Sequence, residues 1–333
     1  MINNLHIERF KDVEEETLDL KPLTVITGVN SAGKSAAIQA ILVVLKKMDA
    51  VGGLLLKPFD YSFKGAVCKY GVFEDYHIIL GTDSGNIELL VNAEESKLDM
   101  KEQSIGLEKN VYYLSANRNG YDKVEQMADD YPVGVQGEYL FGTLYKEKDA
   151  PITLTLFADE EQRTLGSMVD YWLREILGME FKVHTEEKNS NIIVSYDADE
   201  VKGLMPNQLG TAVSYLAKVL IMCLRAKPGD VLIIENPEVH LHPKAQAKLG
   251  EFLTIIANAG VQLIVETHSE HVVNKIQYQI FCQKFDAEKL AIYYKSNPKE
   301  KFEQVVIDER GRYTDDFPEG FFDASLSDLL EIG

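Results

Sequence analysis

The chain has 333 residues, of which 45% are hydrophobic and 26% are charged, so it can bury a large core and is not a disordered protein. Its formal net charge of −19 means that the average surface repels a nucleic-acid backbone, so nucleic acid can bind only at a local basic patch or through a partner. No signal peptide and no run of about twenty apolar residues is visible, and the three cysteines are widely spaced, so we expect a cytoplasmic protein with no membrane span, disulfide framework or zinc site.

The N-terminal segment alternates short apolar runs with polar breaks. Leu5–Phe10 is expected to form a strand, followed by an acidic turn at Glu14–Glu16. Leu23–Thr27 is apolar and β-branched and stands between a proline and a glycine, which is typical of a strand that is buried on both faces. Ser35–Lys47 follows as a helix, because its apolar residues recur at helical spacing.

The middle of the chain, residues 61–205, is predicted to be an inserted segment that is richer in β-structure. Tyr76–Leu80 and Asn86–Val91 flank Asp83-Ser84-Gly85, which is a good hairpin signal. Further elements are expected in chain order: a strand at Val111–Leu114, a loop-rich stretch at Gln126–Lys148, an amphipathic helix at Glu161–Leu177 and a hairpin at Phe181–Tyr196.

The last part of the chain alternates helices and strands, which is typical of an α/β fold. The expected elements are a helix at Gln208–Arg225, a strand at Val231–Glu235, a helix at Pro243–Ala259, a strand at Val261–Glu266, a helix at Glu270–Phe281 and strands at Ala291–Lys295 and Phe302–Ile307. We therefore divide the chain into an N-terminal ATPase lobe (1–60), the inserted segment (61–205), a C-terminal ATPase lobe (206–285) and a small C-terminal domain (286–333). No long heptad run is present, so no coiled-coil arm is expected.

A phosphate-binding loop is predicted at Gly28–Ser35, which fits the pattern G-x-x-x-x-G-K-[ST] between a strand and a helix. Its glycines let successive N–H groups point inward, and the helix that follows adds its N-terminal dipole. Lys34 is placed for the β- and γ-phosphates and the Ser35 hydroxyl for Mg²⁺. The expected nucleotide-binding residues are Asn30, Ser31, Ala32, Gly33, Lys34, Ser35 and Ala36.

Two later strands end in chemically active residues. Glu235 closes an apolar strand, where an acid can hold Mg²⁺, because ligands of α/β sheets collect at the carboxyl ends of strands. His268 follows the next strand and can hydrogen-bond a γ-phosphate or an attacking water. His240 and His242 resemble a metal pair, but no third ligand is near, which disfavours a metal site there.

Together these elements resemble the ABC-type ATPases of the SMC, Rad50 and OLD group. More narrowly, the chain is similar to AAA-type ATPases that carry a small C-terminal domain of unknown function. The segments that carry the resemblance are Ile7–Lys11, Leu18–Gly28, Ser115–Arg118, Val133–Tyr139, Glu235–Pro243, Glu266–His271, Ile307–Gly311 and Phe317–Asp323.

The resemblance implies a P-loop NTPase fold of the ABC-head type and a head-to-head dimer or higher homo-oligomer that sandwiches two ATP molecules with Mg²⁺. Each ATP would lie between the phosphate loop of one subunit and the signature region Leu209–Ser214 of the other. Gly210 and Ser214 would contact the partner's γ-phosphate. Ala212 stands where the family often has a second glycine.

One departure from the family concerns the chemistry. The resemblance gives Glu235 the Mg²⁺, but the next residue, usually the glutamate that polarises water, is Asn236. An amide can orient water but cannot act as a general base. Glu238 can supply the base, since this branch often reads Glu-Asn-Pro-Glu, and slow hydrolysis is expected. Lys11 and Arg118 either touch nucleotide phosphates or are solvated surface charges.

The resemblance therefore implies a dimeric switch that binds ATP, hydrolyses it slowly and regulates a separate effector protein in prokaryotic antiviral defence or DNA metabolism. OLD-type relatives carry a nuclease domain after the ATPase. This chain ends at Gly333 without an acidic metal cluster, so a nuclease activity is expected to come from a partner. The alternative is a scaffold that holds ATP as a structural ligand and does not hydrolyse it. A small-molecule kinase is disfavoured by the signature-like helix.

Overall fold

The computed structural model describes residues 1–48, 75–101, 105–118, 124–155 and 163–314. The chain divides into two compact units, a first unit of residues 1–107 and 286–333 and a second unit of residues 108–285. The first unit therefore joins the two ends of the chain. The four-part division made from the sequence stays a prediction, and the Phe317–Asp323 motif lies outside the described residues.

The first unit contains an antiparallel sheet in the order β2-β1-β4-β5-β6. Its strands are β1 (Ile2–Phe10), β2 (Val13–Asp19), β4 (Tyr76–Thr82), β5 (Gly85–Val91) and β6 (Ser96–Met100). The expected turn at Glu14–Glu16 was wrong, because these residues lie inside β2 and the chain reverses between Phe10 and Val13. Edge strands commonly carry charged side chains, so a run of acids does not exclude a strand.

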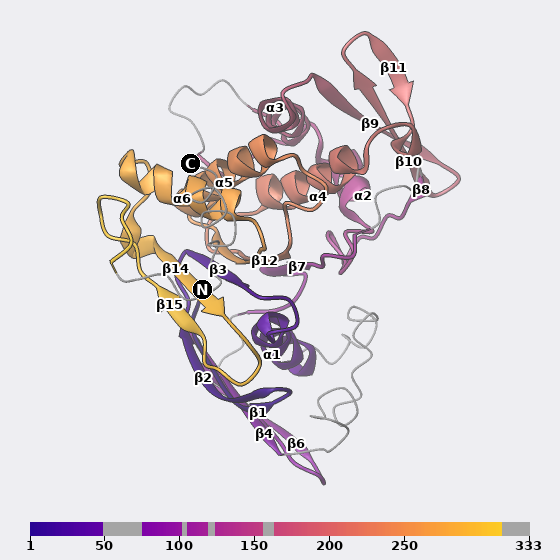
Figure 1. Ribbon diagram of the computed structural model, residues 1–333. Helices are drawn as coiled ribbons and strands as arrows, with labels where there is room; N and C mark the ends of the chain where they lie inside the picture. The colour runs from indigo at the N-terminus through magenta and orange to yellow at the C-terminus, as the bar shows by residue number, and fades with distance from the viewer. Residues whose placement is uncertain (49–74, 102–104, 119–123, 156–162, 315–333) are drawn as a thin grey trace. The chain divides into compact units, whose positions relative to one another are not determined.

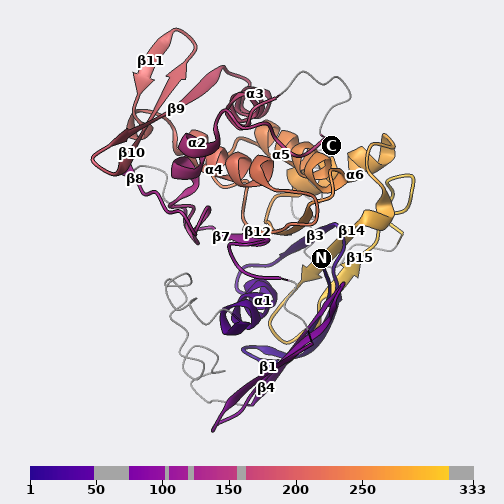
Figure 2. The ribbon, with the colours of Figure 1, turned by 180° about the vertical axis from the view of Figure 1, so that it is seen from behind.

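Two further strands and a helix position the predicted phosphate loop. β3 (Leu23–Gly28) leads through the loop into α1 (Lys34–Met48), and β14 (Leu290–Lys295) runs parallel beside β3. The short β15 (Glu303–Val305) pairs antiparallel with β14. Residues 23–27 of β3 are all buried, which explains why that strand reads as a continuous apolar run. Helix α1 packs against β1, β3 and β4, as Figures 1 and 2 show from opposite sides.

The second unit is built on three parallel strands, with β12 (Val231–Glu235) between β7 (Val111–Leu114) and β13 (Gln262–Glu266). Its helices are α2 (Leu140–Glu147), α3 (Leu165–Leu177), α4 (Thr211–Arg225), α5 (Pro243–Asn258) and α6 (Glu270–Phe281). Helix α5 packs on α6 and α3, and α3 packs on α4 (Figure 1). These strands and helices follow the predicted α/β alternation closely.

A second sheet of this unit surrounds β10 (Asn191–Ala198), which pairs with β8 (Val124–Glu125), β9 (Phe181–Lys188) and β11 (Val201–Leu204). The hairpin of β9 and β10 was predicted, but β8 and β11 are too short to give a sequence signal. Helix α2 was also missed, because the polar stretch around it predicted a loop. Its apolar residues pack against α4, β9 and β10, so tertiary contacts stabilise a helix that its own sequence barely favours.

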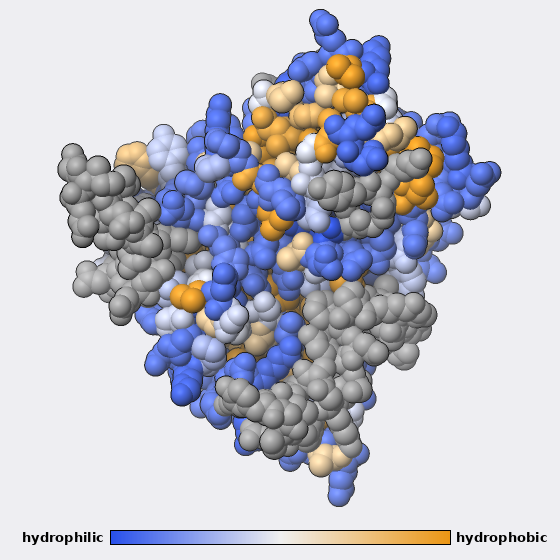
Figure 3. Space-filling model, turned by 45° about the vertical axis from the view of Figure 1, so that its right-hand side comes forward, coloured by the Kyte–Doolittle hydropathy of each residue, from blue (hydrophilic) through white to orange (hydrophobic). Residues whose placement is uncertain are grey.

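The described surface is mostly hydrophilic on the face that Figure 3 shows, with apolar residues gathered toward the upper end of the view. Large exposed apolar side chains around the second sheet include Val124, Met179 and Val201. Among the described residues, no helix has the length and apolar composition that a membrane span requires.

Candidate nucleotide-binding site

The predicted phosphate loop leaves β3 in an unusual backbone conformation. Gly28, Ser31 and Gly33 all have positive φ angles, of 137°, 62° and 95°. Such angles turn successive N–H groups toward one side of the loop. The N–H groups of Asn30, Ser31 and Gly33 donate to no described residue, and Asn30 and Ser31 are exposed. The loop therefore offers a set of backbone donors that an anion can accept from.

The Lys34 side chain folds back onto the start of the phosphate loop. Its ammonium donates to the backbone carbonyls of Gly28 at 3.0 Å and Val29 at 2.7 Å, and its side chain is buried. This places one full positive charge beside the donors of the loop. Ser35 is half-buried in the first turn of α1. The Ala36 N–H already donates to the Gly33 carbonyl at 3.0 Å, so Ala36 has the weakest case among the predicted nucleotide contacts.

Three carboxylates gather where β12 and β13 end in the second unit. Glu235 and Glu266 are register partners in the two strands, and Glu238 lies just beyond β12. All three are buried. The Glu235 carboxylate accepts the Ala116 N–H at 3.2 Å, and the Glu238 carboxylate accepts the His268 N–H at 2.9 Å. Burial raises the pKa of both Glu235 and Glu238 above the usual range, because a desolvated carboxylate resists ionisation.

A buried arginine holds this cluster together. Arg118 is 2% exposed, and its guanidinium donates to the carbonyls of Ser115 at 3.1 Å, Glu235 at 2.8 Å and Asn236 at 2.6 Å. Burial lowers the pKa of Arg118 to about 10, which still leaves it protonated at neutral pH. The interpretation of Arg118 as a solvated surface charge was therefore wrong. It lies beneath the end of β12 and fixes the backbone there.

Asn236 has a strained backbone at the position where the family usually has glutamate. Its φ angle is 43°, in the left-handed region that asparagine tolerates better than most residues. Its N–H donates to the Glu266 carbonyl at 2.7 Å. Its side-chain Oδ1 is buried and accepts no hydrogen bond from any described residue. Strain and an unsatisfied buried oxygen together are typical of a functional position.

The histidines have separate roles. His268 has an exposed side chain, and it follows Glu266 by two residues. His242 accepts the Lys244 N–H and caps the start of α5, and the His240 ring packs edge-on against Tyr215 with centroids 5.0 Å apart. In the part of the chain that the structure describes, no three His, Cys, Asp or Glu side chains form a metal site.

The predicted signature region lies before and within the first turn of α4. Gly210 is the exposed N-cap residue of this helix. Ser214 is 2% exposed, and its hydroxyl accepts a hydrogen bond from Tyr196 at 3.1 Å, so it points into the second unit. Thr211 and Ala212 are half-buried and reach the surface beside Gly210. Thr211, which the predicted signature region includes, is thus a further candidate contact, and Ser214 is a weaker one than expected.

The donor chemistry of these residues fits Mg²⁺. Ser35 offers a hydroxyl, and Glu235 and Glu266 offer carboxylates, which are the hard oxygen ligands that Mg²⁺ prefers. Mg²⁺ keeps several waters and binds together with nucleotide phosphates rather than in a complete protein cage. A preassembled set of three protein ligands is therefore not required for this ion.

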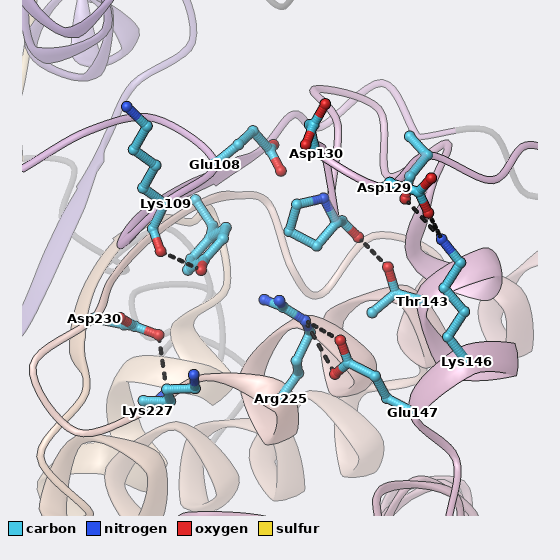
Figure 4. Close-up of a pocket in the computed structure, with 13 residues that line it drawn as sticks. Glu108, Lys109, Asp129, Asp130, Thr143, Lys146, Glu147, Arg225, Lys227 and Asp230 are labelled. Atoms are coloured by element: carbon cyan, nitrogen blue, oxygen red, sulfur yellow. Dashed lines mark hydrogen bonds and ion pairs between the residues drawn. The ribbon is translucent and has the colours of Figure 1, made fainter. Parts of the chain in front are cut away.

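A separate polar cavity of about 260 Å³ lies near the N-terminal ends of β7 and β12, whereas the carboxylate cluster lies at the C-terminal end of β12 (Figure 4). Arg225 faces Glu147 across 3.3 Å, and Lys146 forms an ion pair with Asp129. Glu108 accepts the N–H groups of Val133 and Gly134, both at 2.9 Å, and burial raises its pKa to about 7. These charges largely satisfy one another, so the cavity carries no ligand assignment.

Comparison with protein families matches almost the whole chain in three pieces. Residues 93–274 match the family described as "AAA domain, putative AbiEii toxin, Type IV TA system". Residues 1–130 match a family described as "AAA ATPase domain". Residues 286–332 match a family described as "Protein of unknown function".

Individual proteins extend this picture. The "Old nuclease" of Escherichia phage P2 is 32% identical over 97 residues, which cover 26% of this chain and 17% of that protein. A crystal structure of the SmcHead bound to the C-winged helix domain of ScpA has a TM-score of 0.53 at 14% identity, covering 92% of this chain and 98% of that one. The Smc head domain bound to the C-terminal domain of ScpA, derived from Pyrococcus furiosus, has a TM-score of 0.52 at 11% identity and covers 99% of each chain. These structures share the fold predicted here, that of an ABC-type ATPase head.

Proposed function

Because the chain belongs to the AAA-domain family that its residues 93–274 match, we propose that this ATP-binding AAA ATPase is a slow, dimeric switch that regulates an effector protein. The observation that carries the proposal is the phosphate loop, in which the N–H groups of Asn30, Ser31 and Gly33 donate to no described residue and lie beside the Lys34 ammonium. Triphosphate is the ligand for which such a combination of backbone donors and one lysine is suited.

In this proposal, the phosphate loop binds the phosphates of ATP, and the carboxylate cluster supplies a metal ligand and the general base. Ser35 and Glu235 hold the Mg²⁺, which neutralises phosphate charge when bound. Glu238 takes the proton of the attacking water, and its raised pKa makes it a stronger base than an ordinary glutamate. The Asn236 amide and the His268 ring orient the water and the γ-phosphate.

Slow turnover follows from the asparagine at position 236, where the family usually has a glutamate. The amide cannot accept the proton, so the base is displaced to Glu238, whose carboxylate is already committed to the His268 N–H. A base that is held two residues away from the usual position is expected to meet the water less often in a productive geometry. A long-lived ATP-bound form suits a switch better than a motor.

Dimerisation is proposed from the family, with the exposed first turn of α4 facing the partner's γ-phosphate. Gly210 and Thr211 can donate backbone N–H groups there. The Smc heads that share the fold were solved with a bound ScpA domain, and the partly matching Old protein is named a nuclease. These names support a separate effector, such as a nuclease, and a role in antiviral defence or DNA metabolism. The net charge of −19 favours indirect contact with nucleic acid.

The second candidate function is a scaffold that retains ATP without hydrolysing it. The specific observation in its favour is Asn236, which removes the usual base. The presence of Glu238 and the exposed His268 favours the switch instead.

Phosphate release and light scattering, each with and without ATP and Mg²⁺, test the proposal on the purified chain. Slow release with ATP-dependent dimerisation is the expected result, and the Lys34→Ala variant should show neither. Stoichiometric retention of ATP without release would replace the switch by the scaffold. Absence of ATP binding by the wild-type chain would overturn both.

A further inference from the structure

The segment that matches a family of unknown function contributes a strand directly beside the phosphate loop, within the first unit. β14 belongs to this segment, and its last residue, Lys295, is the register partner of Gly28. The Val29 N–H donates to the Lys295 carbonyl at 3.0 Å. A Cβ atom added to Gly28 would lie 2.1 Å from the Lys295 carbonyl oxygen, so the two backbones are in direct contact. Any shift of Lys295 must therefore move the start of the loop.

The Lys295 side chain is anchored by a buried ion pair. Lys295 is 2% exposed, and its ammonium lies 3.1 Å from the Glu16 carboxylate, which is also buried. The ammonium also donates to the Glu300 carbonyl and lies 4.6 Å from the centre of the Phe302 ring. The same Glu16 oxygen accepts the Phe302 N–H at 2.9 Å. Glu16 thus fixes both ends of the turn that connects β14 to β15.

A buried charge that loses its partner is strongly unfavourable, so this pair fixes the local backbone more firmly than an apolar contact would. The pair lies beneath the surface, at a hollow of about 370 Å³ lined by residues 12–16 and 298–301 together with Lys295. Displacement of the turn at 296–301 would pull on the ammonium and, through the Lys295 carbonyl, on Val29. The loop and the turn are in this way mechanically connected.

We propose that Lys295, held by Glu16, is a positioning residue for nucleotide binding, and that the C-terminal segment supports the phosphate loop. Lys295 touches no phosphate in this role. It keeps Gly28 and Val29 in the conformation from which the loop presents its N–H groups. The inference rests on the proposed function only in that ATP is taken as the ligand of the loop.

Equilibrium binding of ATP tests the role of the pair in the full chain. Lys295→Met should weaken ATP binding about tenfold, because it leaves the Glu16 carboxylate buried without its partner. The double variant Lys295→Met with Glu16→Gln removes both charges and should recover affinity to within about threefold of the wild type. Glu16→Gln alone should weaken binding less than Lys295→Met, since its amide oxygen can still accept the Phe302 N–H.

Tyr293→Phe is the matched control. Tyr293 lies on the same strand and face as Lys295, and its hydroxyl exchanges hydrogen bonds with the backbone of Asp19 at 2.9 and 3.0 Å. Its register partner is Ile26, inside β3 and away from the loop. This variant should lower the thermal midpoint without changing ATP affinity. If it weakens ATP binding as much as Lys295→Met does, the effect is general destabilisation and the proposal fails.

Hydrogen exchange gives a second test, which measures the wild-type chain first and then the Lys295→Met variant. Coupling between two sites is reciprocal, so saturating ATP should slow exchange of the Phe302 amide, and Lys295→Met should abolish that slowing. Unchanged exchange across residues 295–302, or wild-type affinity in a folded Lys295→Met protein, would overturn the inference. Failure of the wild type to bind ATP would instead count against the proposed function.

Discussion

The phosphate loop of the first unit and the carboxylate cluster of the second unit are organised in opposite ways. The loop is one continuous segment, and most of its donors are backbone N–H groups whose direction is set by the φ angles of Gly28, Ser31 and Gly33. The cluster is assembled from residues 115–118, 235–238 and 266–268, and it depends on side chains that are buried together. We therefore expect the loss of one side chain to disturb the folding of the loop little, and the loss of a buried partner to destabilise the cluster strongly.

The positively charged side chains of the two regions, Lys34 and Arg118, also have different roles. The Lys34 ammonium donates to the carbonyls of Gly28 and Val29, which keeps its charge beside the backbone donors of the loop. The Arg118 guanidinium donates hydrogen bonds to three backbone carbonyls, and its charge interacts with the neighbouring carboxylates. The comparison teaches that a positive residue near a nucleotide site serves either the ligand or the fold, and that burial and hydrogen-bond partners distinguish the two.

The largest effect on stability should come from Arg118→Met. The change leaves the carbonyls of Ser115, Glu235 and Asn236 without the Arg118 donor and removes a positive charge that favours ionised Glu235 and Glu238. We expect the free energy of unfolding to fall by about 3–5 kcal/mol, measured by urea denaturation. Arg174→Met is the control, because the Arg174 side chain is 46% exposed on α3. An Arg118→Met protein as stable as this control would contradict the structural role.

Lys34→Ala should lower ATP affinity strongly and stability only slightly, unlike Arg118→Met. Loss of the ammonium removes the counter-charge of the β- and γ-phosphates, so ATP affinity should fall by roughly 10²–10³-fold, with a change of only about 1 kcal/mol in unfolding. Titration with ATP, alongside denaturation of the same sample, separates the two quantities. Micromolar ATP binding by the variant would show that the loop is not the nucleotide site.

Glu238→Gln sharpens the comparison within the cluster. The variant should bind ATP within about threefold of the wild type but turn over about a hundredfold more slowly, because the amide accepts no proton. Glu270→Gln, at the start of α6, should leave turnover unchanged. The general base must be ionised, and burial raises the pKa of Glu238. As pH is lowered, wild-type turnover should therefore begin to decline at a pH above the usual titration range of glutamate. Equal rates for Glu238→Gln and wild type would assign the base to another residue.

Glu108→Gln should give the smallest effect and tests a buried carboxyl that belongs to neither region. The pKa of Glu108 rises from 4.5 to about 7 in the folded state, so the folded protein binds more protons than the unfolded one between these values. Its contribution to stability is therefore complete below pH 4.5 and is lost as pH rises through about 7.

Urea unfolding at pH 5 and pH 8 measures this contribution. Stability should fall more steeply with pH in the wild type than in Glu108→Gln, although the amide itself satisfies only one of the two N–H groups that Glu108 accepts. The same pH dependence in both proteins would show that Glu108 ionises normally. Glu138 and Arg225 are the nearby charges that raise and lower this pKa, so neither should be changed in the same experiment.

Strong local patterns predicted their elements almost to the residue. The apolar run of β12 and the amphipathic helix α6 have the predicted bounds, because each is defined by neighbours within a few residues. Helix α2 and strand β2 were not recognised. The acids of β2 include Glu16, whose partner Lys295 lies 279 residues away, and no local pattern can contain such a partner.

The sequence by itself determined the phosphate loop, the strand-end acid and the ATPase family, because each is marked by particular residues at fixed spacing within one continuous segment. Only the tertiary structure decided the roles of Arg118, Ser214 and Lys295. Each role depends on whether a side chain is desolvated and which distant atom it meets, since burial raises the strength of a hydrogen bond or ion pair and the cost of breaking it. Those quantities arise when the chain folds, and the order of residues does not display them.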